Sequence, residues 1–181
     1  MTPHGPWRIV RQHSIYQDPW IAVRVDDVIR PDGNAGIHSV ITIKPGVNVL
    51  ALDHDGNVYL TEEFHYGVGR VTIEAVSGGI EPDEDALTTA CRELREELGI
   101  ESDEWQDLGM VDPFTANVVS PTRLFLATSL RFLESAPEGT ELIRHFKAPL
   151  RDAVNMVLAG AITHGPTCVV LLKTWIQNCN R

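Results

Sequence analysis

The first third of the chain alternates apolar and polar residues with the two-residue period of β-strands. Five segments are rich in Val, Ile, Tyr and Thr, and short runs of Pro, Gly, Asp and Asn separate them. These segments cover residues 7–16, 20–30, 36–44, 47–53 and 57–64. Because the breaks between them have the size and composition of turns, the pattern predicts an antiparallel meander.

The spacing of apolar residues changes to a helical period from Glu84 to Leu98. Residues 122–130 and 140–148 return to strand character, and residues 150–160 and 166–178 are predicted as helices. This order predicts a sheet with helices packed on it, in an α+β or mixed α/β fold. We find no internal repeat or linker. We therefore expect a single domain over residues 1–181, in which residues 1–45 extend a core formed by residues 46–181.

Composition and charge exclude several classes of partner. The 181 residues are 43% hydrophobic and 22% charged, which is ordinary for a globular domain with a sizeable core. The net charge of -10, from 15 basic and 25 acidic residues, argues against binding to nucleic acid or to an anionic membrane surface. An anionic substrate would therefore need cations to bind here.

The sequence predicts no membrane span, signal peptide, disulfide framework or zinc site. No run reaches the roughly 18 apolar residues of a membrane span, and the start lacks a basic segment followed by an apolar one, so we expect a cytoplasmic protein. Three widely spaced cysteines without a CxxC pair predict neither a disulfide framework nor a zinc site. We expect Cys91 and Cys168 to be small core residues.

The predicted helix from Glu84 to Leu98 has an apolar face and an acidic face. The apolar stripe consists of Leu87, Ala90, Cys91, Leu94 and Leu98. On the second face, the like charges of Glu93 and Glu97 stand at i, i+4, a pairing that costs about 0.2–0.5 kcal/mol. Such an acidic face is either a solvated helix surface or a set of oxygen ligands for a hard cation such as Mg²⁺.

The surroundings of these acids favour the metal site. The stretch fits the pattern Gly, five residues, Glu, seven residues, Arg-Glu-aliphatic-any-Glu-Glu-any-Gly-aliphatic. The matching residues are Gly78, Glu84, Arg92, Glu93, Leu94, Glu96, Glu97, Gly99 and Ile100. This stretch resembles the Nudix box, the signature of hydrolases that cleave nucleoside diphosphates linked to another moiety.

The resemblance implies a role for each polar residue of the box. Metal ligands would be the carboxylates of Glu93, Glu96 and Glu97 and the carbonyl group of Ser77, and the cofactor would be Mg²⁺, with Mn²⁺ able to substitute. Glu84 and Arg92 would orient these acids. From its residue type, Gly78 either adopts a positive φ or allows a close approach to the backbone, and Gly99 can close the helix in the left-handed conformation.

The resemblance extends over nearly the whole chain, to the branch of ADP-ribose and nucleotide-sugar pyrophosphatases. It implies the Nudix fold, an α/β/α sandwich whose mixed sheet has helices on both faces, here with an N-terminal antiparallel strand extension. It also implies a homodimer, since N-terminal strands of this branch exchange or pack between subunits. A Nudix enzyme of this branch would hydrolyse a nucleotide sugar, with ADP-ribose the leading candidate, to a nucleoside monophosphate and a sugar phosphate.

Some positions depart from the branch. Phe64, His65 and Tyr66 stand where many members have Gln-Tyr-Arg, and Arg70 follows five residues after His65. We therefore consider His65 and Arg70 as substrate-binding residues, together with Trp20, which could stack on a base across a dimer. Residues 112–127 also replace a more usual segment, which leaves the form of the adenine-ribose pocket open.

Two questions about catalysis stay open at this point. The general base is either Glu97 in the box or an acid of the segment 135–143, where Glu141 is favoured over Glu138. The alternative to an enzyme is a non-catalytic module that binds a nucleotide derivative and reports to a partner. The intact glutamates of the box favour the enzyme, because a sensor has no need of all of them.

Overall fold

The computed structural model describes residues 1–133 and 143–179 and divides the chain into two compact units. Unit 1 consists of Met1–Pro45 and Asp112–Pro121, and unit 2 consists of Gly46–Val111 and Thr122–Arg181. Unit 1 is thus assembled from two stretches that lie far apart in the sequence. The expectation that the whole chain behaves as a single domain stays a prediction.

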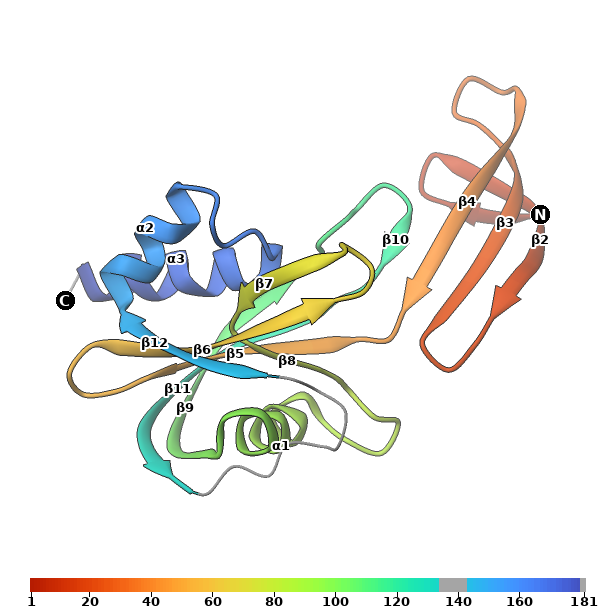
Figure 1. Ribbon diagram of the computed structural model, residues 1–181. Coiled ribbons are helices and arrows are strands. Elements are labelled where there is room, and N and C mark those ends of the chain that lie inside the picture. The colour runs from red at the N-terminus through yellow and green to blue at the C-terminus, as the bar shows by residue number, and fades with distance from the viewer. Residues whose placement is uncertain (134–142, 180–181) are drawn as a thin grey trace. The chain divides into compact units, whose positions relative to one another are not determined.

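Unit 1 contains a five-stranded sheet with the order β1-β2-β3-β4-β10 (Figure 1). The strands are β1 Thr2–His4, β2 Trp7–Gln17, β3 Ile21–Ile29, β4 Ala35–Ile43 and β10 Val118–Val119. The first four pair antiparallel with their neighbours, as the alternating pattern predicts. β10 pairs with β4 in the parallel direction, with Val118 opposite Ile41.

Unit 2 contains a seven-stranded mixed sheet. Its strands are β5 Gly46–Leu52, β6 Asn57–His65, β7 Arg70–Glu74, β8 Val76–Gly79, β9 Ile100–Val111, β11 Thr122–Phe132 and β12 Arg144–Pro149. The main path runs β12-β6-β5-β11-β9, while β7 pairs with β6 and β8 pairs with β5. The pairing of β11 with β5 is parallel and makes the sheet mixed.

One edge of β5 is shared between two strands. Residues 46–49 of β5 pair with β8, whereas residues 51–52 pair with β6. The chain passes from β7 to β8 at Ala75, which is fully buried. The sheet is therefore split along this edge, and β8 carries the start of the box away from the β6–β7 hairpin.

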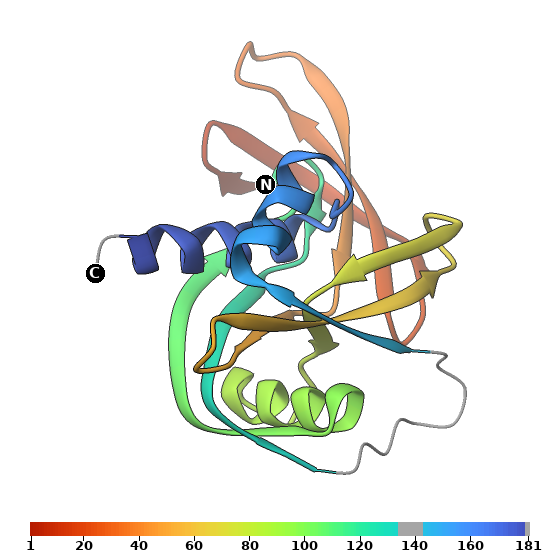
Figure 2. The ribbon, with the colours of Figure 1, turned by 60° about the vertical axis from the view of Figure 1, so that its left-hand side comes forward.

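Helices cover both faces of the unit 2 sheet. They are α1 Ala86–Leu98, α2 Leu150–Leu158 and α3 Gly165–Cys179. Figures 1 and 2 show α1 on one side of this sheet and α2 with α3 on the other. In the part of the chain that the structure describes, no helix is both long and apolar enough to cross a bilayer.

Two hydrophobic cores follow from this arrangement. Alternate residues of β5 point to opposite faces, so Val47 and Val49 join the core under α1, whereas Leu50 joins the core under α2 and α3. Burial on both faces explains why β5 reads as a nearly continuous apolar run. The predicted mixed sheet with helices on both faces and an N-terminal strand extension is confirmed.

Two local expectations were wrong. The five N-terminal strands do not form one meander, because β5 and β6 belong to the sheet of unit 2. The stripe on α1 is also shifted: Cys91 and Leu87 are exposed, and Thr89 is buried instead. Thr89 tolerates burial because its hydroxyl donates to Glu84 Oε2 at 2.8 Å.

The strand β9 was not predicted, because it is rich in acidic residues. It lies at one edge of the sheet and pairs with β11 along its length. An edge strand keeps much of its surface in water, so acidic side chains are tolerated there and discourage pairing with another chain. The alternating apolar signal is correspondingly weak.

Replacing Gly99 by Ala is expected to lower the free energy of unfolding by about 1–2 kcal/mol, because φ at this C-cap residue is 63°. Urea denaturation measures the effect. The matched control is Gly165→Ala at the first residue of α3, where an added Cβ meets no described atom within 4 Å. Equal stability of Gly99→Ala and the wild type would contradict the assigned cap.

Candidate metal and nucleotide site

The acidic helix α1 begins with a side-chain cap. Asp85 is the N-cap residue, and its Oδ1 accepts a hydrogen bond from the backbone N–H of Thr88 at 2.8 Å. This bond satisfies one of the free N–H groups at the start of a helix. The pKa of Asp85 lies below its ordinary value. The main cause is the hydrogen bond from the backbone N–H of Thr88, and a hydrogen bond from the backbone of Leu87 contributes less.

Arg92 binds three carboxylates of the box. Its Nε and Nη2 donate to the two oxygens of Glu84 at 2.9 and 3.1 Å. Its Nη1 donates to Glu93 Oε1 at 2.8 Å and to Glu96 Oε2 at 3.0 Å. The hydrogen bonds of Glu84, followed by the charge of Glu93 and the hydrogen bonds of Glu96 and Glu93, raise the pKa of Arg92, although partial burial opposes the shift. The orienting role expected of Glu84 and Arg92 requires such contacts and stays a prediction.

Glu84 is a fixed anion in this arrangement. Hydrogen bonds from Arg92 and then from Thr89 lower its pKa from 4.5 to about 2, although desolvation opposes them. Its side chain is 19% exposed. Glu84 therefore holds Arg92 from the side opposite to Glu93 and Glu96, which leaves the guanidinium in one orientation.

Gly78 makes room for Glu93. A Cβ atom built on Gly78 would lie 2.0 Å from the carboxyl carbon of Glu93, which no real side chain tolerates. Gly78 does not have a positive φ. Of the two explanations for this glycine, the close approach is therefore the one that the structure supports, and the carboxylate of Glu93 lies against the backbone of β8.

The strand β8 brings Ser77 next to the same carboxylate. Ser77 precedes Gly78 and stands opposite Asn48 of β5 in the antiparallel register. The carbonyl group of Ser77 belongs to the peptide unit that joins it to Gly78. The carbonyl group of Ser77 is therefore bonded directly to Gly78, the residue against which the carboxylate of Glu93 lies.

The donor atoms fit a hard divalent cation. Glu93, Glu96, Glu97 and the carbonyl of Ser77 offer only oxygen, which Mg²⁺ and Mn²⁺ prefer. The absent side chain of Gly78 supplies the space in which Glu93 lies beside the backbone donor. In the described ranges no group of three or more Asp, Glu, His or Cys side chains is arranged to hold a metal ion, and the carboxylates of Glu93 and Glu96 both contact Arg92.

Glu97 is the last residue of the acidic face and lies in the final turn of α1. Its backbone carbonyl accepts a hydrogen bond from His145 Nε2 at 2.8 Å, which ties β12 to the last turn of the helix. This bond occupies a carbonyl group that the end of a helix leaves without a partner inside the helix. The alternative general bases, Glu138 and Glu141, lie outside the described residues.

His65 and Arg70 belong to a polar cluster beside the start of α3. They stand opposite each other on β6 and β7. Arg70 Nη2 donates to Thr163 Oγ1 at 2.7 Å, and His65 Nε2 lies 3.2 Å from Glu74 Oε1. The other oxygen of Glu74 lies 2.9 Å from His164 Nδ1. The sequence identified two members of this cluster but not Glu74 or His164.

Glu74 remains ionised within the cluster. Desolvation is the largest influence and acts to raise its pKa, but contacts with His164, Thr72 and His65 together outweigh it and lower the pKa. Thr72 Oγ1 donates to Glu74 Oε1 at 2.6 Å. The carboxylate is thus held by groups from β6, β7 and the segment before α3.

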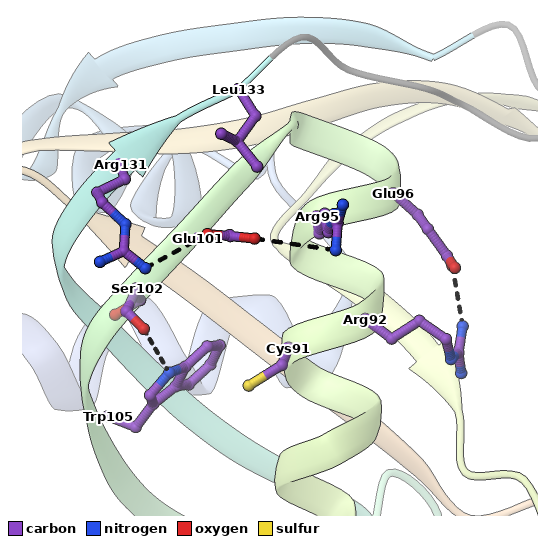
Figure 3. Close-up of a pocket in the computed structure, with 9 residues that line it drawn as sticks. All are labelled: Cys91, Arg92, Arg95, Glu96, Glu101, Ser102, Trp105, Arg131 and Leu133. Atoms are coloured by element: carbon purple, nitrogen blue, oxygen red, sulfur yellow. Dashed lines mark hydrogen bonds and ion pairs between the residues drawn. The ribbon is translucent and has the colours of Figure 1, made fainter.

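A cleft of about 740 Å³ opens between α1 and the strands β9 and β11, and it includes Arg92 and Glu96 of the box (Figure 3). Its lining residues are Cys91, Arg92, Arg95, Glu96, Glu101, Ser102, Trp105, Arg131 and Leu133. Arg131 pairs with Asp103 at 2.6 Å and with Glu101 at 3.3 Å, and Arg95 lies 3.9 Å from Glu101. These ion pairs compensate much of the positive charge in the cleft.

Trp20 belongs to unit 1 and is 71% exposed. Its backbone is fixed, because its N–H donates to Asp18 Oδ1 at 2.8 Å and its carbonyl accepts from Lys44. The indole ring is therefore exposed on a hydrogen-bonded turn that precedes β3. Its proposed contact with a base stays a prediction.

The family can be assigned once this geometry is known. Residues 42–152 match the NUDIX domain, and residues 7–41 match the nucleoside diphosphate sugar hydrolase N-terminal domain. The chain belongs to the Nudix family. Nudix hydrolases use divalent metal cations, in agreement with the oxygen donors of the box.

Curated relatives cover most of this Nudix chain. The ADP-ribose pyrophosphatase of Mycobacterium tuberculosis (strain ATCC 25618 / H37Rv) is 28% identical over 168 residues, which are 91% of this chain and 80% of the relative. The ADP-ribose pyrophosphatase of Bacillus subtilis (strain 168) is 27% identical over 158 residues, 83% of this chain and 82% of the relative. The methanol dehydrogenase activator of Bacillus methanolicus is 26% identical over 174 residues, 94% and 93% of the two chains.

A solved structure shares the fold. The crystal structure of an ADP compounds hydrolase superposes with a TM-score of 0.82 and covers 100% of both chains at 17% sequence identity. The expected Nudix fold and the expected membership of the Nudix hydrolases are therefore confirmed.

Replacing Glu84 by Gln is expected to destabilise the protein at neutral pH, with an effect that disappears in acid. The folded pKa of Glu84, about 2, lies below its ordinary value of 4.5. Its contribution is therefore complete above pH 4.5 and is lost as the pH falls through about 2.

Urea unfolding of the Glu84→Gln variant over this pH range measures the change, with Asp83→Asn as the matched control. Asp83 is the preceding residue and is exposed. A difference between Glu84→Gln and the wild type that stays constant down to pH 2 would contradict the ion pair with Arg92.

Proposed function

We propose that this Nudix protein hydrolyses the pyrophosphate bond of a nucleoside diphosphate linked to a sugar. The products are a nucleoside monophosphate and a sugar phosphate. The observation that carries the proposal is the set of acids on α1, which Arg92 orients and which meets the backbone of β8 at Gly78. A solvated helix face has no need of a glycine that admits one of its carboxylates to a neighbouring strand.

Different residues of the chain would hold the metal ions and orient the ligands. Glu93, Glu96, Glu97 and the carbonyl of Ser77 would hold Mg²⁺, or Mn²⁺ in its place, as the resemblance implies. When bound, such ions neutralise the diphosphate and lower the pKa of a coordinated water. Arg92, itself held by Glu84, keeps Glu93 and Glu96 together and aligned against the repulsion of their like charges.

A general base must remove a proton from the attacking water. Glu97 is one candidate because it stands on the acidic face of α1. Glu141, and after it Glu138, are the alternatives. Measuring the pH dependence of kcat for the three Gln variants separates them, because only loss of the base removes the acidic limb of the profile.

The substrate class rests on the relatives. Two of them are named ADP-ribose pyrophosphatases, and the N-terminal match is to nucleoside diphosphate sugar hydrolases. ADP-ribose is accordingly the leading candidate among nucleotide sugars. We propose His65 and Arg70 as substrate-binding residues, because their side chains project from opposed positions of one hairpin. A cytoplasmic location, expected from the sequence, stays a prediction.

A sensor without catalysis is the second candidate. One specific observation favours it: a relative that matches over 94% of this chain is named an activator of another enzyme. Such a module would bind a nucleotide derivative and signal to a partner protein. The complete set of box acids supports the enzyme instead.

Hydrolysis of a substrate panel distinguishes the two functions. We expect release of a nucleoside monophosphate from ADP-ribose or a related nucleotide sugar with Mg²⁺ and none in EDTA. Glu97→Gln is expected to lower kcat by about 10²- to 10⁴-fold if Glu97 is the base. The matched control is Glu104→Gln on the exposed surface of β9, which is expected to keep the activity of the wild type.

The panel contains ADP-ribose, GDP-mannose, UDP-glucose, NADH, diadenosine polyphosphates and 8-oxo-dGTP. Tight binding of any of these without turnover in Mg²⁺ or Mn²⁺ would overturn the enzyme and favour the sensor. Turnover that EDTA and Glu97→Gln leave unchanged would overturn the role of the box.

We also propose that the chain forms a homodimer through unit 1. One face of its sheet is apolar on two adjacent strands, since residues that pair across β3 and β4 share a face. The apolar residues of this face are Ile21, Val23, Val25, Ile29, Ala35, Ile37, Ile41 and Ile43. Ile37 is 72% exposed and Ile43 is 38% exposed, which supports a partner surface.

Light scattering coupled to size exclusion is expected to show a dimer that Ile37→Glu weakens, because a charge at this position opposes burial of the apolar face. Leu158→Glu is the matched control, since Leu158 is 74% exposed at the end of α2. A dimer that Ile37→Glu leaves intact and Leu158→Glu dissociates would place the interface elsewhere.

A further inference from the structure

The peptide unit between Ser77 and Gly78 is held from both faces of the sheet. On the face that carries α1, the carboxylate of Glu93 lies against Gly78. On the opposite face, the hydroxyl of Ser77 accepts a hydrogen bond from Asn48 Nδ2 at 2.8 Å and donates to Ala75 O at 3.0 Å. The proposed backbone ligand thus lies between the acidic helix and a polar group in the second core.

Thr167 is the centre of this polar group. Its Oγ1 accepts the backbone N–H of Ala75 at 2.9 Å and Asn48 Nδ2 at 3.3 Å, and it lies 2.9 Å from His164 Nδ1. Asn48 Nδ2 also donates to Ala75 O at 3.1 Å. One threonine of α3 therefore fixes both the strand that leads to Ser77 and the amide that binds the Ser77 hydroxyl.

Because these polar groups are buried, water cannot replace their hydrogen-bond partners. Asn48, Ala75 and Thr167 are each 0% exposed, and the N–H of Ala75 has no access to water. Ala75 also lies where the chain leaves β7 and enters β8, at the split edge of β5. At such a crossing no regular ladder continues, so side-chain hydrogen bonds replace it.

We propose that Thr167, acting with Asn48, is a positioning residue for the metal ligand on β8. This inference rests on the proposed function, in which the carbonyl of Ser77 and the acids of α1 hold a divalent cation. Thr167 touches neither the metal nor the substrate. It sets the depth at which the Ser77–Gly78 peptide lies between α3 and Glu93.

The physical reason is that a cation tolerates little displacement of its ligands. Mg²⁺ and Mn²⁺ bind oxygen at short, nearly fixed distances, and groups that orient ligands typically change metal affinity by about 10- to 100-fold when removed. Without the Thr167 hydroxyl, the buried N–H of Ala75 loses its acceptor. The strand is then expected to move toward another acceptor and to carry Ser77 with it.

The helix α3 provides a matched control. Thr174 is also 0% exposed, lies on the same helix and has a hydroxyl without a hydrogen-bond partner among the described residues. Thr174→Val therefore removes a buried hydroxyl from α3 without changing a contact to β8. Thr167→Val removes the acceptor with nearly the same volume, and Thr167→Ser restores it.

Binding of Mn²⁺ alone to the full chain, followed by the electron paramagnetic resonance signal of free Mn²⁺, tests the inference. Thr167→Val is expected to raise the dissociation constant of Mn²⁺ about 10-fold. Thr167→Ser and Thr174→Val are expected to bind like the wild type. In the activity assay, Thr167→Val is expected to need about 10-fold more Mg²⁺ for half-maximal rate, with kcat unchanged at saturation.

Wild-type affinity in a folded Thr167→Val variant would overturn the inference, even if its melting temperature is lower. If Thr167→Val does not fold, Ser77→Ala decides, because it keeps the backbone carbonyl and removes the hydroxyl bound to Asn48. Wild-type affinity of Ser77→Ala would then overturn the inference. Glu93→Gln separates the two proposals: if the wild type binds Mn²⁺ no better than Glu93→Gln, the metal site itself is overturned.

Discussion

Charge compensation by Arg92 is the interaction on which the rest of the site depends. Glu93 and Glu96 repel each other on one face of α1, in a chain that already carries a net charge of -10. The guanidinium holds both, and Glu84 holds the guanidinium in turn. Because the guanidinium of Arg92 offsets the repulsion between these carboxylates, the helix stays folded with an acidic face. The same carboxylates can then bind a second cation.

The sheet of unit 2 explains why the acids meet a backbone ligand at all. β5 cannot pair with β6 and β8 at the same residues, so it divides its edge between them. The chain must therefore cross at Ala75, and this crossing turns β8 into a short, independently held strand. Its two faces serve different purposes: Gly78 admits Glu93 on one side, and Ser77 is fixed from the other.

The sequence predicted those features that depend on local spacing and failed where contacts span the fold. Strand periodicity located β2 to β6, the helical spacing of residues 84–98 predicted α1 with its acidic face, and the residue type of Gly99 predicted its left-handed end. The acidic edge strand β9 lacks the expected periodicity. Glu74 and His164 become neighbours only through tertiary structure. Asn48 did leave a signal, because it is a single amide inside an otherwise apolar strand, and such a residue needs a buried partner.

The sheet of unit 1 is built from two stretches of sequence that flank the first segment of unit 2, Gly46–Val111. β4 ends at Ile43, but the strand that pairs with its outer edge begins only at Val118, after β5 to β9 and α1. During synthesis from the N-terminus, β1 to β4 leave the ribosome while that edge still lacks its neighbour. An uncovered strand edge readily recruits other strands. The topology therefore imposes an order of assembly, in which the N-terminal sheet is completed only after more than half of the Nudix core has been made.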